Sequence, residues 1–573
     1  MVKKDSSKFN QTLFNKASYR LQEHLKKHTG GINKLINIIL NNYAVKSKQK
    51  TVELEIDKEI EELKSILYSG NLQKIPVLAT RHVESLAMRI CEALRQVNIN
   101  SEVIYSEPKS GFDDETLYFV LCPQMFDSLP KLYFAFQLEQ TINPRWMTDN
   151  YIEKLKGAIA IADYSLNNVG YLQDKGIELK NIFYIPIRPV HIKKTRSEFK
   201  YDVIFYGDDN CPRRQSILTE LKKHFSVKVC KEIFGQELHE ELKYAKVAIN
   251  IHYYDKALLE SVRLSELIEN GKLIVSERGI EKCENEAFEK LVSFVDADDI
   301  DGLVYHIKKL LDGDAENSLV NDYSDEYCNE FLYGLYRLLL AFDIVSFEQF
   351  YEIIGKKIEI KNVTALSLKE SRLRNEMFKA SYPEIFMFSG LRHYVSWKGC
   401  GLSYKFLMRR AYDEGLENIA ICEDDVWLPS NWENSLAQIK SYLNNRNWDI
   451  FFGLIADVHP ETKIFSSEKT DLGELVCLDK PVSLVFCLYN KTAYSKIFTW
   501  DHHLNGMGNT IDRYIQRNGT LTSYCLYPYF VKLKSAKSTL WKDVANDVYN
   551  NIIVKSEKEL QEKLLQYKKY IGR

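Results

Sequence analysis

Hydrophobic and polar residues follow two rhythms along this chain, one typical of buried strands and one typical of amphipathic helices. From residue 75 onward, short apolar runs are separated by helical patterns such as ESLAMRICEALRQ; the runs are IPVLA, SEVIY, TLYFVLC, KLYFAFQL and GAIAIA. A parallel sheet covered by helices on both faces produces this alternation. We therefore predict an α/β lobe over residues 74–190.

A second series of the same kind follows a connector rich in proline and basic residues, IPIRPVHIKKTRSEFK. Its predicted strands are YDVIFYG, SVKVC, KVAINI, KLIVSE and LVSFV, with helical patterns between them. A mostly helical bridge then extends to Lys357. Residues 191–357 are predicted to form a second Rossmann-like lobe together with this bridge.

The two ends of the chain have different patterns. Residues 358–573 read as a third α/β unit that closes with a charged helix, in which Leu560, Leu564 and Leu565 are predicted to share one side. Residues 1–73 read as a helical segment. The apolar spacing of INKLINIIL within it fits either a helix packed on the protein or a stripe that binds a membrane surface. For the rest of the chain, residues 74–573, the predicted fold class is α/β.

Composition narrows the functional classes. The 573 residues, 45% hydrophobic and 27% charged, are enough for several folded units. The 77 basic and 79 acidic side chains nearly cancel, so no overall field attracts nucleic acid, and none is expected as a partner. Eleven cysteines without a CxxC pair favour a reducing compartment. Because neither a signal sequence nor an 18-residue apolar run is present, we expect a cytoplasmic location.

The start of the second lobe has a pattern suited to phosphate binding. In VIFYGDDNCPRRQSILTEL, Gly207 directly follows a predicted strand and Pro212 falls in the first turn of the next helix. Arg213 and Arg214 stand beside it. Backbone N–H groups at a helix start attract anions, and a guanidinium adds bidentate donors for phosphate oxygens. We predict that this turn contacts a diphosphate.

A later helix of the same lobe carries the stronger pattern, ALLESVRLSELIENGKLIVSE, in which Arg263 and Glu266 precede Gly271 and a buried strand. It resembles the nucleotide-sugar half of group-1-type GT-B glycosyltransferases, which need no metal. The resemblance implies that Glu266 binds the ribose hydroxyls, that Arg263 faces the diphosphate and that Glu260 belongs to the donor site. The alternative is an exposed helical pair. The retaining pattern has two glutamates eight positions apart, whereas Ile268 stands at that distance from Glu260, so the stereochemistry is open.

In the first lobe, the loop ATRHVES follows the opening strand and contains His82 and Glu84. Ligands bind at the carboxyl ends of strands in open α/β sheets. His82 is therefore a candidate general base and Glu84 a second catalytic candidate. The alternative for His82 is a solvated loop histidine.

Three adjacent acids end an apolar strand of the third unit, where Glu423, Asp424 and Asp425 follow Asn418–Cys422. Neighbouring carboxylates raise one another's pKa and repel, and a divalent cation with a preference for oxygen ligands would relieve this. Strand alternation places Glu423 and Asp425 on one side. They are the predicted ligands of Mn²⁺ or Mg²⁺. The alternative is an acidic loop that caps a helix.

The passage around these acids is similar to glycosyltransferase family 25, whose members have the GT-A fold. The similarity extends over much of residues 361–540 and rests on the Gly-Cys-Gly-Leu-Ser stretch at Gly399–Ser403, on the acids and on Arg372 and Arg374 after the first strand. Tyr404 stands where the family commonly has histidine. The resemblance implies that Arg372 contacts the nucleotide sugar.

The same resemblance implies that Asp512 sits where an inverting enzyme keeps the base that deprotonates its acceptor. The alternative is a surface pair with Arg513. Further candidates for a metal ligand late in the chain are Asp457, His459, His502 and His503.

Together these patterns predict a glycosyltransferase, bifunctional if both modules work, that moves sugars from nucleotide-sugar donors onto a bacterial surface glycan or glycolipid precursor. Such an enzyme would be a cytoplasmic protein that can also bind peripherally to the inner face of the inner membrane. Two alternatives stay open. In the first, only one module is catalytic. In the second, the chain is a non-catalytic scaffold that binds sugar nucleotides or carbohydrate.

Overall fold

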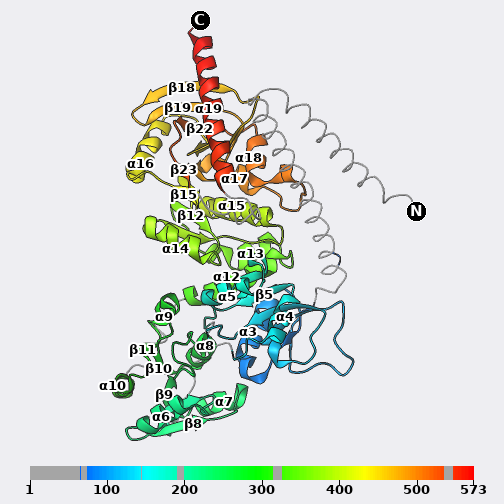
Figure 1. The fold of residues 1–573 in the computed structure, drawn as a ribbon, viewed down its shortest axis with the longest axis vertical. Helices are drawn as coiled ribbons and strands as arrows, with labels where there is room; N and C mark the ends of the chain where they lie inside the picture. The colour runs from blue at the N-terminus through cyan, green and yellow to red at the C-terminus, as the bar shows by residue number, and fades with distance from the viewer. Residues whose placement is uncertain are drawn as a thin grey trace, which may run out of the picture. The chain divides into compact units, whose positions relative to one another are not determined.

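The computed structural model describes Ser65 and residues 74–142, 145–189, 199–313, 325–534 and 546–572. Apart from Ser65, these residues belong to one compact unit, Gly70–Arg573. The predicted N-terminal helical segment with its INKLINIIL stripe lies outside the described residues, as does most of the basic connector. Three larger β-sheets, whose strands are labelled in Figure 1 where there is room, organise the rest, and two further sheets have two strands each.

The first sheet has six strands in the order β2-β1-β3-β4-β5-β6, all parallel. We call residues 74–189, which contain it, lobe 1. The strands β1 to β5 come from the five predicted apolar runs, whereas β6 lies in a stretch that was not predicted as a strand. Helix α3 covers the predicted helix residue for residue. The elements are β1 (Val77–Leu78), α3 (Glu84–Gln96), β2 (Val103–Ile104), β3 (Leu117–Leu121), β4 (Leu132–Gln137), α4 (Asp149–Lys156), β5 (Ala160–Asp163), α5 (Leu166–Asp174) and β6 (Ile182–Tyr184).

The second sheet has five parallel strands in the order β11-β10-β9-β7-β8 and defines lobe 2, residues 199–313. Its central strands β9 and β10 are almost fully buried, whereas the edge strand β8 is mostly half-buried. Pro212 begins α6, and Gly271, with φ +67°, follows the end of α8, both as predicted. The elements are β7 (Tyr201–Tyr206), α6 (Pro212–Leu221), β8 (Val227–Cys230), α7 (Gly235–Leu242), β9 (Ala245–Asn250), α8 (Ser261–Glu269), β10 (Leu273–Glu277), α9 (Lys282–Phe288), β11 (Ser293–Val295) and α10 (Ile300–Asp312).

A helical bridge, α12 (Asp325–Ala341) and α13 (Phe347–Ile353), leads to the C-terminal unit, residues 358–572. Its eight-stranded mixed sheet has the order β13-β12-β14-β21-β16-β22-β19-β18, in which β21 runs antiparallel to both β14 and β16. The main elements are β12 (Val363–Ser367), α14 (Arg372–Ser381), β13 (Phe386–Ser389), α15 (Ser396–Asp413), β14 (Asn418–Glu423), α16 (Trp432–Leu443), β16 (Ile450–Phe452), β18 (Ile464–Thr470), β19 (Gly473–Leu478), β21 (Phe486–Asn490), α17 (Lys491–Phe498), α18 (Ile511–Arg517), β22 (Ser523–Tyr527) and α19 (Asn546–Ile571).

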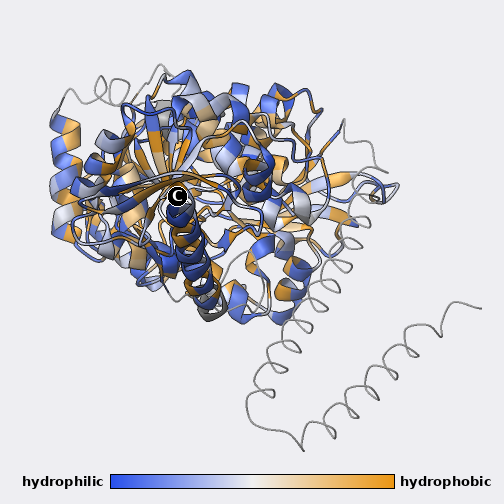
Figure 2. Ribbon diagram, turned by 90° about the horizontal axis from the view of Figure 1, so that it is seen from above, coloured by the Kyte–Doolittle hydropathy of each residue, from blue (hydrophilic) through white to orange (hydrophobic). Residues whose placement is uncertain are grey.

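Apolar side chains gather on the strands, which Figure 2 shows largely in orange, whereas α19 carries both blue and orange positions. In α19, Leu560 and Leu564 are buried, but Leu565 is 53% exposed. The prediction that all three leucines share one side was therefore wrong for Leu565. Five residues advance an α-helix by about 500°, which turns residue 565 well away from the direction of residue 560.

Buried charge ties lobe 1 to the bridge and the C-terminal unit. Glu370, fully buried, pairs with Arg337 of α12 at 2.7 Å and lies 3.4 Å from Arg392. It also accepts the backbone N–H of Tyr184 in β6 at 3.0 Å. Burial alone raises the pKa of a carboxyl group, but the two guanidiniums lower that of Glu370 to about 2. The carboxylate is thus a charged centre shared by three segments.

Candidate functional site

The carboxyl ends of the strands in lobe 1 and lobe 2 face one another. Gln140, just after β4, exchanges two hydrogen bonds with the backbone of Leu258, which lies between β9 and α8. The amide accepts the Leu258 N–H at 2.9 Å and donates to its carbonyl at 3.3 Å. Ser165 of lobe 1 also donates to Glu281 of lobe 2 at 2.8 Å. Ligands bind at this edge in open α/β sheets, so both lobes present their reactive edges to one region.

Two arginines of lobe 2 converge on the glycine turn after β7. Gly207 has φ +126°, and a Cβ atom added there would lie 3.0 Å from Nη2 of Arg263 and 3.9 Å from Nη1 of Arg214. Arg214 also donates to the carbonyl of Asp208 at 2.6 Å. Glycine is required here both by its backbone conformation and by the closeness of the guanidiniums. The predicted phosphate turn therefore has two cations beside it.

Both arginines share one carboxylate, that of Glu260. Its Oε1 accepts from Arg214 at 3.1 Å and its Oε2 accepts from Arg263 at 2.5 Å. Although burial raises the pKa of Glu260, the guanidiniums of Arg263 and Arg214 bring it below its usual value. Arg263 is further held by the Asn250 side-chain oxygen at 2.7 Å. An arriving diphosphate would compete with Glu260 for these donors.

Glu266, on the next turn of α8, is 6% exposed and has two side-chain partners. Its Oε2 accepts the hydroxyl of Tyr206, at the end of β7, at 3.0 Å. Its Oε1 lies 3.1 Å from Nε2 of His239 in α7. Because a carboxylate can accept about four hydrogen bonds, these contacts leave acceptor sites for a diol. Sequence reasoning missed both partners, since neither belongs to the motif.

Arg213 points elsewhere than its neighbour. It forms an ion pair with Glu277, which is fully buried at the end of β10, and another with Asp298 at 2.8 Å. It also donates to the carbonyl of His252 at 2.7 Å. The structure thus brings Gly207 and Arg214 to the Arg263 cluster and places Arg213 in a separate pair beside it.

His252 is a residue that the sequence patterns did not single out. Its ring is 1% exposed, and Nδ1 lies 3.9 Å from Oε2 of Glu260. Neither ring nitrogen has a hydrogen-bond partner among the described residues. Buried polar atoms are normally hydrogen-bonded, so the imidazole of His252 is an exception beside the Arg263–Glu260 pair.

The lobe 1 side contributes His82 and Glu84 from the turn after β1. His82 Nδ1 lies 2.9 Å from the hydroxyl of Thr80, and its ring contacts that of Phe234 in lobe 2 edge-on, with centroids 6.4 Å apart. Partial burial lowers the pKa of His82, which favours the neutral ring that a base requires. Glu84 packs against Gly235 of lobe 2, so both candidates face the opposite lobe.

A second charged cluster lies at the end of β14 in the C-terminal unit. The guanidinium of Arg374 contacts Asp424 and lies 3.2 Å from Oδ2 of Asp425, and Ser367 donates to Asp424. The strand ends at Glu423, so the predicted alternation does not continue through the acids. Asp424 and Asp425 instead share the guanidinium of Arg374.

Glu423 lies in surroundings that disfavour its charged form. Burial, reinforced by Asp425 and then Asp424, raises its pKa to about 8. The charge of Asp512 in α18 also raises the pKa of Glu423, so the two carboxyl groups interact electrostatically. The guanidinium of Arg513 donates to Asp457 at 3.2 Å, and only its backbone N–H donates to Asp512. The structure therefore brings Asp512 and the acids to one region.

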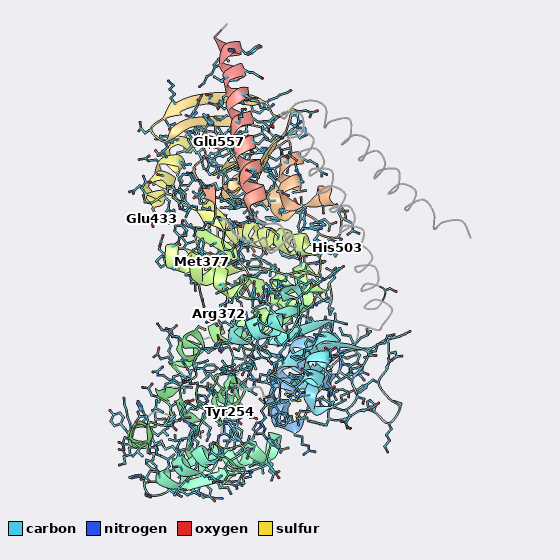
Figure 3. The ribbon with its side chains drawn as sticks, in the orientation of Figure 1. Tyr254, Arg372, Met377, Glu433, His503 and Glu557 are labelled. Carbon is cyan, nitrogen blue, oxygen red and sulfur yellow. The ribbon has the colours of Figure 1, made fainter. Side chains whose placement is uncertain are left out.

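Arg372, labelled in Figure 3, has different partners from Arg374. It pairs with Glu376 at 2.7 Å and contacts Asn167 of lobe 1. Nothing among its described contacts joins it to the acids at the end of β14. The Gly-Cys-Gly-Leu-Ser stretch lies inside α15, where a Cβ on Gly401 would collide with Trp500. These glycines let α15 pack closely, which is a structural role.

Within the described residues, one group offers three metal-ligating atoms within 4.8 Å of one another, and it consists of Asp343, His502 and His503. His502 and His503, candidates for a late metal ligand, thus lie beside the bridge. No helix of the described part of the chain is long and apolar enough to cross a membrane.

No model of a known protein family and no curated protein matches this sequence. The solved structure of the lipopolysaccharide outer core galactosyltransferase WaaB in its apo form is 12% identical, with a TM-score of 0.27 over 46% of this chain and 99% of that one. WaaG, a glycosyltransferase involved in lipopolysaccharide biosynthesis, is 11% identical, with a TM-score of 0.31 over 46% and 98%. Sucrose-phosphate synthase from Thermosynechococcus elongatus is 9% identical, with a TM-score of 0.32 over 54% and 99%. These values are too low to transfer any residue's role to this chain.

Proposed function

We propose that the chain is a glycosyltransferase whose donor, a nucleotide sugar, binds at the carboxyl edge of the lobe 2 sheet. The convergence of Arg214 and Arg263 on the Gly207 turn is the observation that carries this proposal. Guanidiniums next to an open backbone turn suit the two phosphates of a diphosphate. Glu266, held by Tyr206, offers its remaining acceptor sites to the ribose diol.

In the proposed sugar transfer, lobe 1 binds the acceptor and supplies the base. An acceptor hydroxyl bound against lobe 1 gives its proton to His82 as its oxygen bonds to the anomeric carbon of the donor. The bond from that carbon to the diphosphate oxygen breaks, and the nucleoside diphosphate leaves with the electron pair. Arg263 and Arg214 stabilise the charge that develops there. Glu84 packs on Gly235 and orients the lobe 1 loop for this step.

A second donor site is proposed in the C-terminal unit, as a GT-A-like module. Mn²⁺ or Mg²⁺ commonly binds one or two carboxylates together with substrate phosphates, and the repulsion around Glu423, which Arg374 only partly offsets, fits such a cation. Glu423 and Asp425 would hold it, and the cation would neutralise the departing diphosphate. Asp512 would take the acceptor proton. Arg372 remains a candidate for donor contact at this module's border with lobe 1.

The proposed acceptor is a precursor of a bacterial surface glycan, either a glycan or a glycolipid, with the chain acting on the cytoplasmic side and associated peripherally with the inner membrane. A glycolipid precursor would keep the reaction at a membrane surface, which is consistent with a chain whose described helices do not span one. We propose no nucleic-acid partner, since the net charge is −2.

The test is release of nucleoside diphosphate, or of CMP from CMP donors, from a panel of UDP-, GDP-, TDP- and CMP-linked sugars, with and without Mn²⁺. Arg263→Ala removes a charge-assisted hydrogen bond worth about 1.5–3 kcal/mol, so we expect donor affinity to fall roughly 10- to 150-fold. Glu220→Gln, on an exposed face of α6, is the control and should leave affinity unchanged. Equal effects of the two variants would contradict the lobe 2 assignment.

Asp425→Asn separates the two modules. If it abolishes a metal-dependent release while Arg263→Ala abolishes a metal-independent one, both modules are catalytic. Loss of all release in only one variant assigns catalysis to one module. Donor binding by calorimetry without any release, from any donor, would contradict transfer and favour a binding scaffold.

A further inference from the structure

A histidine and aspartate cluster, made of residues that belong to neither proposed donor site, joins the bridge to the C-terminal unit. Asp343 lies in the turn that follows α12, and His502 and His503 lie in the loop that follows α17. One ligand atom from each residue lies within 4.8 Å of the other two. The three residues come from segments that are 159 residues apart in the chain. Figure 3 labels His503 on the C-terminal unit.

The carboxylate of this cluster is already oriented. The Oδ1 atom of Asp343 lies 3.2 Å from Nε2 of His502, and Oδ2 lies 3.3 Å from Nε2 of His393. The Nδ1 atom of His393 accepts the N–H of Val395 at 3.0 Å, so the ring's proton is on Nε2 and is donated to Asp343. A carboxylate held in this way by a further hydrogen bond is typical of metal ligands.

His502 supplies an independent observation. The residue is 4% exposed, and its Nδ1 atom is buried without a hydrogen-bond partner among the described residues. Because Nδ1 points away from Asp343, it is left for a water, and Nε2, which lies 3.2 Å from Oδ1 of Asp343, is the atom that would bind the ion together with that carboxylate. The neighbouring ring of His503, whose centroid lies 3.9 Å away, is exposed and gives an ion access from solvent.

We propose that Asp343, His502 and His503 bind a divalent transition metal ion of the zinc class and so fasten the bridge to the C-terminal unit. Two imidazoles and one carboxylate match the ligands that Zn²⁺ prefers and differ from the all-oxygen sets that suit Mg²⁺. Ligand atoms around tetrahedral zinc lie about 3.4 Å apart, so small side-chain rotations close the present spacing. The nearby Lys398 directs its ammonium to Asn505 at 2.9 Å.

The experiment uses the full-length chain without a histidine tag, stripped with chelator and dialysed against micromolar Zn²⁺ in excess Mg²⁺. Mass spectrometry of the metal should find one zinc per chain. His503→Ala changes an exposed side chain, and we expect at least a tenfold loss of zinc affinity because a direct ligand is removed. His224→Ala, which changes an exposed histidine of lobe 2, is the matched control and should retain the zinc.

Cobalt provides a second readout, because Co²⁺ in a site with imidazole ligands absorbs visible light in a manner that depends on its geometry. The wild type and His224→Ala should show the same bands, and His503→Ala and Asp343→Asn should lose them. A wild type that binds no zinc, or a His503→Ala variant that binds as much as His224→Ala, would overturn the proposal. Neither outcome bears on donor hydrolysis at lobe 2, so the two proposals fail separately.

Discussion

Replacing Glu370 by glutamine should destabilise the junction of lobe 1, the bridge and the C-terminal unit. The carboxylate is fully buried between Arg337 and Arg392, at 2.7 and 3.4 Å. Glutamine keeps the shape but leaves both guanidiniums without their counter-charge. Removing one partner of a buried ion pair costs about 3–5 kcal/mol.

The pKa of Glu370 gives a second route to the magnitude. A change from the ordinary value of 4.5 to about 2 corresponds to roughly 3 kcal/mol of stabilisation. Because the folded pKa is lowered, this stabilisation is fully present above pH 4.5 and is lost as the pH falls towards 2. The difference between wild type and Glu370→Gln should shrink over the same range.

Urea unfolding of the full-length chain, followed by circular dichroism and by tryptophan fluorescence, measures the effect as a lower midpoint for the first transition. The matched control is Glu352→Gln in α13, which removes an exposed pair with Lys356 in the same bridge. Exposed pairs of this type contribute about 0.3–0.5 kcal/mol. If both variants shift the midpoint equally at pH 7, the buried charge centre does not stabilise the junction.

Two further perturbations test other features of the site. Gly235 has φ +56°, and a Cβ atom added there would collide with the Glu84 carboxylate. Gly235→Ala should therefore lower the free energy of unfolding by about 1–2 kcal/mol, measured by thermal unfolding, and should lower donor turnover. The control Gly170→Ala adds a Cβ that meets no neighbour and should change neither quantity. Glu423→Gln should stabilise the metal-free protein relative to wild type as the pH rises from 4.5 to about 8, because the raised pKa of Glu423 makes its ionisation in the folded state costly. The gain is at most about 5 kcal/mol, and it is smaller than that because Glu423 is partly exposed. A gain that is the same at pH 5 and at pH 8.5 would contradict ionisation of Glu423 as its cause.

Local pattern was sufficient for every strand of the two lobes except β6. The run YDVIFYG became β7, and α8 with Arg263 and Glu266 ends before Gly271, as the helix-stop signal predicted. Such features depend on neighbours within a few residues, because strand and helix periods and the φ preference of glycine are local properties. The acids at the end of β14 were predicted for the same reason.

Partners from distant segments could not be predicted in this way. Glu266 meets Tyr206 and His239 because β7, α7 and α8 of lobe 2 come together. Likewise Arg374, and not Arg372, reaches the acids at the end of β14. No spacing in one sequence encodes these meetings, since they depend on strand order and helix packing.

What the sequence determined by itself is therefore the set of local elements, their α/β class and the residue types available at the ends of their strands. Only the tertiary structure decided which charges share a site. It divided Arg213 from Arg214, gave Glu260 to two arginines and placed Asp343 beside His502 across 159 residues. The physical reason is that side-chain periodicity acts over a few residues, whereas electrostatic and metal-ligand contacts require the chain to be folded first.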